Sequence, residues 1–385
     1  MHLMFADTSA ARRAIPVGWR EVGLLAACLL VATVGSDALG FGPLPSAAAE
    51  LEGLKRYNFR RVEMAVPIHI ILYAPDEESA STAARAAFDE IHRLNGVFSD
   101  YDAQSELRRL CETAGSGTVV LVSEDLWAVL QASQRIARQS DGAFDITIGP
   151  VVRLWRRARR RYRLPSEQRL AEARQAVGYD LIRLVPEKRA VALTADDMRL
   201  DLGGIAKGYA IDAALAVLRR HGVERALIDA GGDVRLGDPP PGQSGWHVQV
   251  ATGKEPEVAA SPPRPAQEGE VGPVVLDLAN VAVATSGDVW QSVEIDGTHY
   301  SHIVDPRTGI GLTDRSTVTV VAPTGMLADA LASAVSVLGP PKGIALAGKY
   351  ANTAVRVVRA PGGRPESHQS PSWEALPRLA QMKEK

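Results

Sequence analysis

The sequence contains little cysteine, little net charge and no long apolar run. Only Cys28 and Cys111 occur in 385 residues, without a C-x-x-C pair or a Cys/His cluster, so structural zinc, iron–sulfur clusters and a disulfide framework are not expected. The formal net charge is −2, which argues against bulk nucleic-acid binding, because that requires an excess of cations. With 46% hydrophobic residues, the composition is that of a globular protein and excludes global disorder.

The N-terminal segment, residues 1–49, has the pattern of an export signal. A stretch with three arginines precedes an apolar run over 22–34, and a small-residue cleavage-type site follows at 47–49. The run is shorter than the roughly 20 apolar residues of a comfortable membrane span. We therefore expect an exported protein, periplasmic or on the outer face of the cytoplasmic membrane. A lipid anchor on Cys28 and an uncleaved anchor stay open as alternatives, and either would associate the chain with the membrane.

Strands and helices alternate irregularly along the rest of the chain. Apolar residues at helical spacing predict helices over 78–96, 123–140, 205–220 and 326–338. Runs of β-branched residues predict strands over 67–73, 118–122, 191–194, 226–229, 246–251, 274–278, 281–285, 292–295 and 317–322. Several strands are hairpin-linked, as Asp296-Gly297 indicates. This pattern favours an α+β fold over a regularly doubly wound one.

Composition divides the part after the signal into three regions. We predict a catalytic domain over 50–360, within which residues 239–273 form a Pro-rich surface insertion, and a loosely ordered tail over 361–385. Seven arginines lie between Arg153 and Arg163. They form either a solvated cationic face or a docking site for an acidic partner or an anionic lipid.

Four segments gather glycines, acids and hydroxyls where strands are expected to end. Residues 141–150 (DGAFDITIGP) offer glycines for close backbone approach and the Phe144 ring as a face for a planar group. Residues 201–209 (DLGGIAKGY) pass through a Gly-Gly turn into a helix, where backbone amides and Lys207 form a candidate phosphate cradle. This cradle lacks the spacing of a Walker loop and of a dinucleotide fingerprint.

The other two segments add a base and hard oxygen ligands. Residues 300–309 (YSHIVDPRTG) place an imidazole, a carboxylate and a guanidinium within six positions, so His302 is a candidate base. On the last long helix, Asp329 and Ser333 are four residues apart and share a face. A carboxylate with a hydroxyl suits Mg²⁺. Together the four segments indicate a Mg²⁺-assisted reaction on a ligand that contains a pyrophosphate.

The order of these motifs resembles the ApbE family of FAD:protein FMN transferases. The matching stretches are DGAFDITIGPVVRLW, LDLGGIAKGYAID, ALIDAGGDV, ATSGD, YSHIVDPRTG and ADALASAVSVLG, with a fainter match at 98–110. The resemblance implies an α+β, T-fold-like architecture with mixed or antiparallel sheets and packed helices. It also implies Mg²⁺-dependent transfer of FMN from FAD to a threonine or serine hydroxyl of an exported redox protein, with release of AMP.

The resemblance further implies roles for individual residues. His302 would activate the acceptor hydroxyl, and Lys207 and Asp201 are the other catalytic candidates. The metal would be held by the backbone oxygen of Gly204 and the side chains of Asp329 and Ser333. The flavin nucleotide would be contacted by Met64, Tyr101, Ala143, Phe144, Asp145, Asp201, Lys207 and Ile303. Asp201 is expected either to hold the adenosine part of FAD or to orient Lys207.

Two other functions use the same site residues. A Mg²⁺-dependent FAD pyrophosphatase would admit water in place of the acceptor hydroxyl and give FMN and AMP. A non-catalytic FAD-binding protein would not need Lys207, His302 and Asp329, all of which are present. Two of the departures from the family pattern fall on proposed site residues. Ser333 stands where threonine is common, and Glu63-Met64-Ala65-Val66 replaces the usual Met-Gly-Thr.

Overall fold

The structure is a computed structural model that describes residues 53–250, 274–287, 292–360 and 366–378. The predicted export signal with Cys28, residues 251–273 of the predicted insertion and the last seven residues lie outside this part. Among the described residues, no helix combines the length and apolar character needed to cross a membrane.

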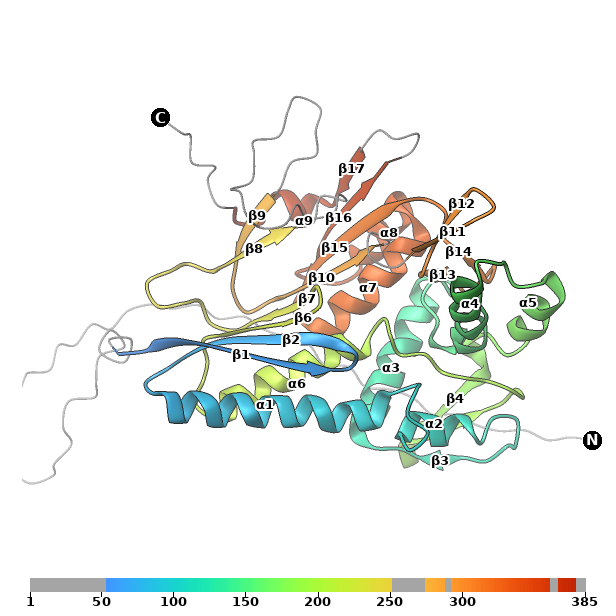
Figure 1. The fold of residues 1–385 in the computed structure, drawn as a ribbon, viewed down its shortest axis with the longest axis horizontal. Helices are drawn as coiled ribbons and strands as arrows, with labels where there is room; N and C mark the ends of the chain where they lie inside the picture. The colour runs from blue at the N-terminus through green and yellow to red at the C-terminus, as the bar shows by residue number, and fades with distance from the viewer. Residues whose placement is uncertain (1–52, 251–273, 288–291, 361–365, 379–385) are drawn as a thin grey trace, which may run out of the picture. The chain divides into compact units, whose positions relative to one another are not determined.

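An antiparallel sheet forms the centre of the described chain (Figure 1). Its eight described strands lie in the order β1-β2-β6-β7-β10-β15-β16-β17, and every neighbouring pair is antiparallel. The strands are β1 (Lys55–Glu63), β2 (Val66–Ala74), β6 (Ala226–Ala230), β7 (Asp233–Leu236), β10 (Ala282–Gly287), β15 (Ser316–Ala322), β16 (Ala354–Arg359) and β17 (Glu366–Gln369). The expected α+β fold with antiparallel sheets and packed helices is confirmed.

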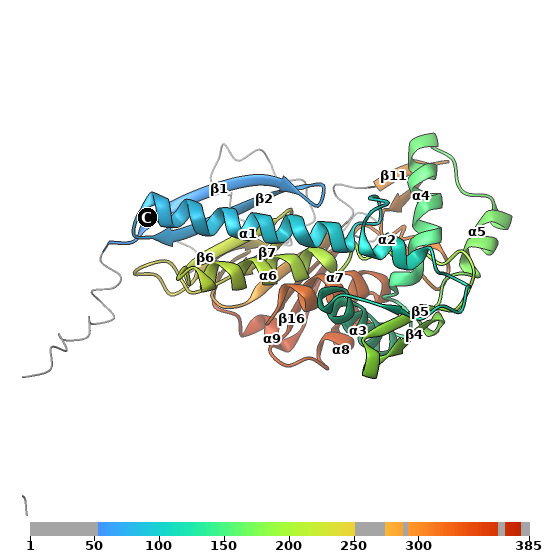
Figure 2. The ribbon, with the colours of Figure 1, turned by 90° about the horizontal axis from the view of Figure 1, so that it is seen from below.

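Helices cover one face of this sheet (Figures 1 and 2). α1 (Glu77–Phe98) packs on α6 (Ala206–Arg220), α6 packs on α7 (Gly325–Leu338), and α7 packs on β10 and β15. Strand residues that face this layer, such as Ile70 and Leu72, are fully buried in the main core, as the two-residue period of a strand requires. The predicted helices over 78–96, 205–220 and 326–338 are confirmed to within two residues at each end.

The opposite face of the sheet is covered by a hairpin and the C-terminal segment. Ile71 and Tyr73, which alternate with the residues facing the helices, pack against a second core cluster. That cluster includes Trp246 of β8 (Trp246–Val250), residues of β9 (Val274–Leu278) and Trp373 of α9 (Pro371–Glu374). β8 and β9 pair with each other in a separate antiparallel sheet. The strands between the two edge strands β1 and β17 are therefore packed on both faces.

Two predictions about surface segments are corrected by this packing. Residues 366–378 of the predicted loose tail form β17, which pairs with β16, and α9, whose Trp373 is 0% exposed. Residues 246–250 form β8, with Trp246 buried. This confirms the strand predicted over 246–251 but removes these residues from the predicted surface insertion. Both errors have one cause. A single tryptophan buries a large apolar area, and composition averaged over a polar segment hides it.

The remaining elements extend the helical layer. α2 (Glu106–Cys111) and α3 (Glu124–Gln139) share the main core with the small sheet β3-β5-β4, whose strands are β3 (Val120–Leu121), β4 (Ile182–Val185) and β5 (Ala190–Leu193). α8 (Pro340–Ala347) follows α7 and packs on it. The helix expected over 123–140 is α3, and it begins at the side-chain cap that Ser123 provides.

A third core cluster joins an arginine-rich helix to two hairpins. α4 (Gly149–Arg161), which is followed by α5 (Glu167–Arg174), contributes Trp155 to this cluster. The hairpins are β11 (Ser292–Ile295) with β12 (Thr298–Ser301), and β13 (Val304–Asp305) with β14 (Ile310–Gly311). The hairpin turn predicted at Asp296-Gly297 is confirmed, and both residues have the positive φ of a two-residue turn.

Helices α6 and α7 approach each other through glycines. A Cβ atom on Gly208 would overlap the backbone of Gly325, and a Cβ atom on Gly325 would overlap the carbonyl oxygen of Gly208. Asp212 of α6 accepts hydrogen bonds from the amides of Gly325 at 2.8 Å and Met326 at 3.0 Å, so it caps α7. The crossing also places Asp329 beside the start of α6, where the Gly208 amide donates to its Oδ2 at 3.2 Å.

The substitution Gly208→Ala should destabilise the fold, because its methyl group overlaps the backbone of α7. We expect a loss of about 2 kcal/mol or more in the free energy of unfolding. Gly96→Ala, the matched control in α1, has open space around its Cβ and should add about 0.5–1 kcal/mol through helix propensity. Urea unfolding of both variants measures whether each substitution lowers or raises the free energy of unfolding. Equal effects would contradict the close crossing.

Candidate active site

Lys207, in the first turn of α6, lies between two carboxylates from other elements. Its ammonium forms an ion pair with Asp233 at the start of β7 and lies 3.8 Å from Oδ2 of Asp329 on α7. The exposed fractions of the three side chains are 26%, 6% and 7%. Burial opposes the charged lysine, but the two carboxylates more than offset this effect and raise the pKa of Lys207. Lys207 is therefore a fixed positive charge near the surface of the core.

Asp329 is the carboxylate with the most perturbed environment in this group. Burial and the nearby Asp233 raise the pKa of Asp329 to about 7, against the opposing effects of Lys207 and the Gly208 amide. One ammonium thus faces two buried carboxylates, and the second carboxylate loses its proton only near neutral pH. A cation bound beside Asp329 would favour its ionised form, because opposite charges stabilise each other.

The three predicted metal ligands come together at this point. Asp329 and Ser333 are one turn apart on α7, and a Cβ atom on Gly204 would lie 2.7 Å from Oγ of Ser333. The backbone of Gly204 therefore lies against the serine hydroxyl. Among the described residues, no group of three or more His, Cys, Asp and Glu side chains is arranged to hold a metal. A metal here would need the hydroxyl and backbone oxygens as well as the carboxylate, which is a hard oxygen set that fits Mg²⁺.

The predicted flavin-binding stretch 143–145 lies beside Gly204. The Cε2 atom of Phe144 would be 3.5 Å from a Cβ atom on Gly204, and both Ala143 and Phe144 are buried. Asp145 is occupied within the loop, because its Oδ1 accepts hydrogen bonds from the amide of Thr147 at 2.9 Å and its hydroxyl at 2.7 Å. The carboxylate of Asp145 thus shapes the loop, and the backbone and ring of its neighbours adjoin Gly204.

Tyr101 and Asp201 meet in a second group, around Arg156 of α4. The Arg156 guanidinium donates to Oδ2 of Asp100 at 2.5 Å and to Oδ2 of Asp201 at 3.0 Å, and its Cζ lies 4.4 Å from the centre of the Tyr101 ring. Burial and the neighbouring Asp100 raise the pKa of Asp201. Lys207 pairs with Asp233 and Asp329, whereas Asp201 pairs with Arg156.

His302 and Ile303 lie on the segment that joins β12 to β13. Both are half-buried, and the Ile303 amide donates to Oγ of Ser301 at 3.1 Å while its carbonyl accepts from Leu312 at 2.9 Å. In the turn that follows, Asp305 and Arg307 form a bidentate pair at 2.8 and 2.9 Å. The carboxylate and guanidinium of the YSHIVDPRTG motif therefore hold the turn, and His302 lies between the two hairpins.

Met64 lies in the two-residue turn between β1 and β2. Met64 and Ala65 have φ values of 50° and 62°, which suits a tight hairpin turn. The residue after this turn, Val66, lies next to the turn that precedes Asp233, because a Cβ atom on Gly231 would be 3.4 Å from the Val66 Cβ. The Met64 turn thus adjoins the strand that supplies the partner of Lys207.

Two residues that organise these groups were not predicted as site residues. Asp233 is part of the ALIDAGGDV motif, and the preceding Gly231-Gly232 turn with positive φ at both residues was the available signal. Arg156 was visible only as one of seven clustered arginines. Nothing in the sequence distinguishes it from its neighbours, because its role depends on where α4 places it.

The chain is similar in sequence and in fold to proteins of one family. The sequence model of the ApbE family matches residues 64–357. The FAD:protein FMN transferase of Haemophilus influenzae is 29% identical over 80% of this chain and 88% of its own length. The FAD:protein FMN transferase of Treponema pallidum is 33% identical over 68% of this chain and 74% of its own length. The ApbE protein of Thermotoga maritima shares the fold with a TM-score of 0.72 and 27% identity, over 84% of this chain and 100% of that one.

The substitution Asp329→Asn should make stability less dependent on pH. Because the pKa of Asp329 is raised from 3.8 to about 7, the stability that this group contributes is fully present below about pH 3.8 and is lost as the pH rises through about 7. The free energy of unfolding of the variant, relative to the wild type, should therefore increase across that window. Urea unfolding in EDTA at several pH values measures it, and a constant difference would contradict the raised pKa.

Proposed function

Since this chain belongs to the ApbE family, we propose that it transfers FMN from FAD to a threonine or serine hydroxyl of a protein, with Mg²⁺ required and AMP released. Relatives that cover most of its length are named FAD:protein FMN transferase. The observation that most supports the Mg²⁺ requirement and the release of AMP is a group of residues at the α6–α7 crossing: Lys207, Asp329, Ser333 and Gly204. It combines a fixed cation with hard oxygen ligands, as a pyrophosphate substrate requires.

The reaction needs positioning and charge neutralisation more than covalent chemistry by the protein. The acceptor oxygen forms a bond to the phosphorus that is linked to riboflavin, and the anhydride bond to the AMP phosphate breaks. Lys207 stabilises the negative charge that develops on the phosphate oxygens. Asp329, Ser333 and the Gly204 carbonyl would hold Mg²⁺, which when bound supplies further neutralising charge. Phe144 and the adjoining backbone position the flavin side.

His302 is proposed as the group that takes the proton of the acceptor hydroxyl. An imidazole suits this step, because its ordinary pKa lies close to neutral pH. The hydrogen bonds of Ile303 fix the position of His302 on the β12–β13 segment. The Tyr300 ring adds to this, because its centre lies 5.2 Å from the centre of the Trp155 ring on α4. The proton leaves the hydroxyl as its oxygen attacks, so the base must be held in place.

The N-terminal sequence supports a proposal for where the chain acts. Residues 1–49 have the basic, apolar and small-residue regions of an export signal in the expected order. We therefore propose that the chain works outside the cytoplasm and that its acceptor is an exported redox protein.

The substitution Asp329→Ala should abolish Mg²⁺-dependent turnover. Lys207 retains its partner Asp233, so we expect the fold to remain intact while the oxygen ligand set is lost. The initial rate of AMP release, measured against Mg²⁺ concentration, tests this. Asp89→Ala, which removes an exposed acid from α1, is the control. Unchanged turnover of Asp329→Ala at saturating Mg²⁺ would contradict the metal role.

The substitution His302→Ala should slow FMN transfer more than it weakens FAD binding, because a base acts on the acceptor and not on the bound nucleotide. Single-turnover labelling of an acceptor peptide and FAD titration by flavin fluorescence measure the two effects. His299→Ala, three residues away on β12, is the matched control. Equal losses in transfer and binding would show that His302 is a binding residue instead.

A further inference from the structure

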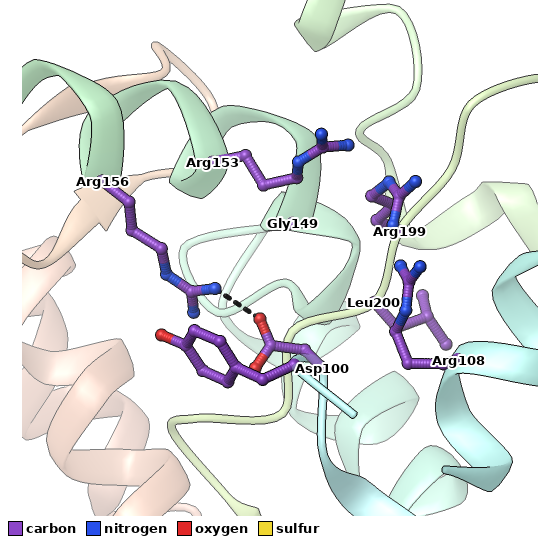
Figure 3. Close-up of a pocket in the computed structure, with 8 residues that line it drawn as sticks. Asp100, Arg108, Gly149, Arg153, Arg156, Arg199 and Leu200 are labelled. Carbon is purple, nitrogen blue, oxygen red and sulfur yellow. Dashed lines mark hydrogen bonds and ion pairs between the residues drawn. The ribbon is translucent and has the colours of Figure 1, made fainter. Parts of the chain in front are cut away.

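A cleft of about 320 Å³ lies between α2, α4 and the loop before Asp201. Its walls include four arginines, Arg108, Arg153, Arg156 and Arg199. Figure 3 shows Arg153 pointing across the cleft towards Arg199, with Arg108 beside Arg199, whereas Arg156 turns towards Asp100. The guanidinium groups come from three separate parts of the chain, so the fold and not the sequence assembles this charge.

Most of this positive charge is not neutralised within the described chain. Arg156 has carboxylate partners in Asp100 and Asp201. Across the described residues, Arg108, Arg153 and Arg199 form no ion pair with a carboxylate. Three like charges that share one cleft repel one another, and an anionic ligand would relieve that repulsion.

The cationic surface continues along α4 towards α5. A second cleft, of about 620 Å³, shares Tyr101, Arg153, Arg156 and Arg199 with the first. It adds Arg157, Arg160 and Arg169, and the acids Glu172 and Asp197. We call the two together the cationic groove. Since the volume of either cleft exceeds what one phosphate or one carboxylate would fill, the groove fits an extended ligand with several negative groups.

Tyr101 belongs both to the cationic groove and to the proposed flavin contacts. It is 75% exposed, lines both clefts and is one of the proposed flavin contacts. Arg156 lies against its ring and also binds Asp201, two residues before the Gly-Gly turn that leads to Lys207. A polypeptide that brings its hydroxyl to the flavin phosphate would therefore pass close to the groove.

We propose that the cationic groove binds acidic side chains of the acceptor protein, on one side of the residue that receives FMN. This inference rests on the proposed function and adds the chemistry of the partner. The pyrophosphate of FAD already has a cation in Lys207, so it does not account for a second set of arginines. Arg108 and Arg199 are half-buried within the cleft, where side chains of a polypeptide can reach them more readily than the surface of a bilayer.

Two peptides that share one acceptor threonine test the groove. One has three aspartates beside the threonine, and the other has asparagines at the same positions. Binding of fluorescent peptides to the full chain is measured by anisotropy, independently of FMN transfer. The acidic peptide should bind about tenfold more tightly, as expected for charge-assisted hydrogen bonds, and the difference should shrink as salt is raised.

Charge reversal gives the sharper test. Arg153→Glu with Arg199→Glu should remove the preference for the acidic peptide and favour a lysine version of it. Arg161→Glu is the matched control, because Arg161 lies on the same helix but outside both clefts, and it should retain most of the preference. If Arg161→Glu reduces the preference as strongly as the double variant, the preference comes from the overall positive charge of α4 and not from the clefts, and the proposal fails.

The outcomes separate this inference from the proposed function. Equal binding of the acidic and neutral peptides would contradict the proposal that the groove binds acidic side chains, whether or not either peptide is labelled. Labelling of both peptides in that case would still support FMN transfer. Binding to phosphatidylglycerol vesicles that depends on Arg153 and Arg199, without discrimination between peptides, would overturn the proposal in favour of a membrane contact. Tighter binding of the acidic peptide without labelling would support the groove and count against transfer.

Discussion

The buried charges of Lys207, Asp233 and Asp329 form the interaction on which the rest of the site depends. An ammonium and two carboxylates are costly to bury unless they compensate one another, and here they come from α6, β7 and α7. This arrangement is possible only because Gly208 and Gly325 let the two helices touch. The same crossing presents the Asp329 side chain one turn before Ser333, beside Gly204. Packing and chemistry are thus set by one contact.

The surrounding fold holds this contact in place from several directions. The central sheet is buried under helices on one face and under β8, β9 and α9 on the other, so β7 and β10 cannot shift without disturbing two cores. Asp212 caps α7 from α6, and Asp145 shapes the loop that supplies Phe144. These carboxylates are engaged in structure, whereas burial and the nearby Asp233 raise the pKa of Asp329 to about 7.

Much of the fold could be predicted from periodicity, and much of the site from motif order. The long helices show apolar residues at regular spacing, and Asp296-Gly297 marks its hairpin locally. β1 was not predicted, because its alternation is short: after Tyr57 and Phe59 the same face of the strand continues with charged Arg61 and Glu63. The burial of Trp373 depends on β16, on which α9 packs, and on the cluster that also contains Trp246. Asp233 and Arg156 were missed for the same reason: their roles arise from neighbours that only the folded chain brings together.

The site around Lys207 and Asp329 is proposed to transfer FMN from FAD to a protein hydroxyl. Incubation of the full chain with FAD, Mg²⁺ and a threonine-bearing acceptor peptide, followed by intact mass measurement of the peptide, tests this proposal most directly. We expect the mass of the peptide to increase by that of one FMN less one water, with an equal molar amount of AMP released. Free FMN and AMP with an unlabelled peptide would contradict the proposal and identify a hydrolase.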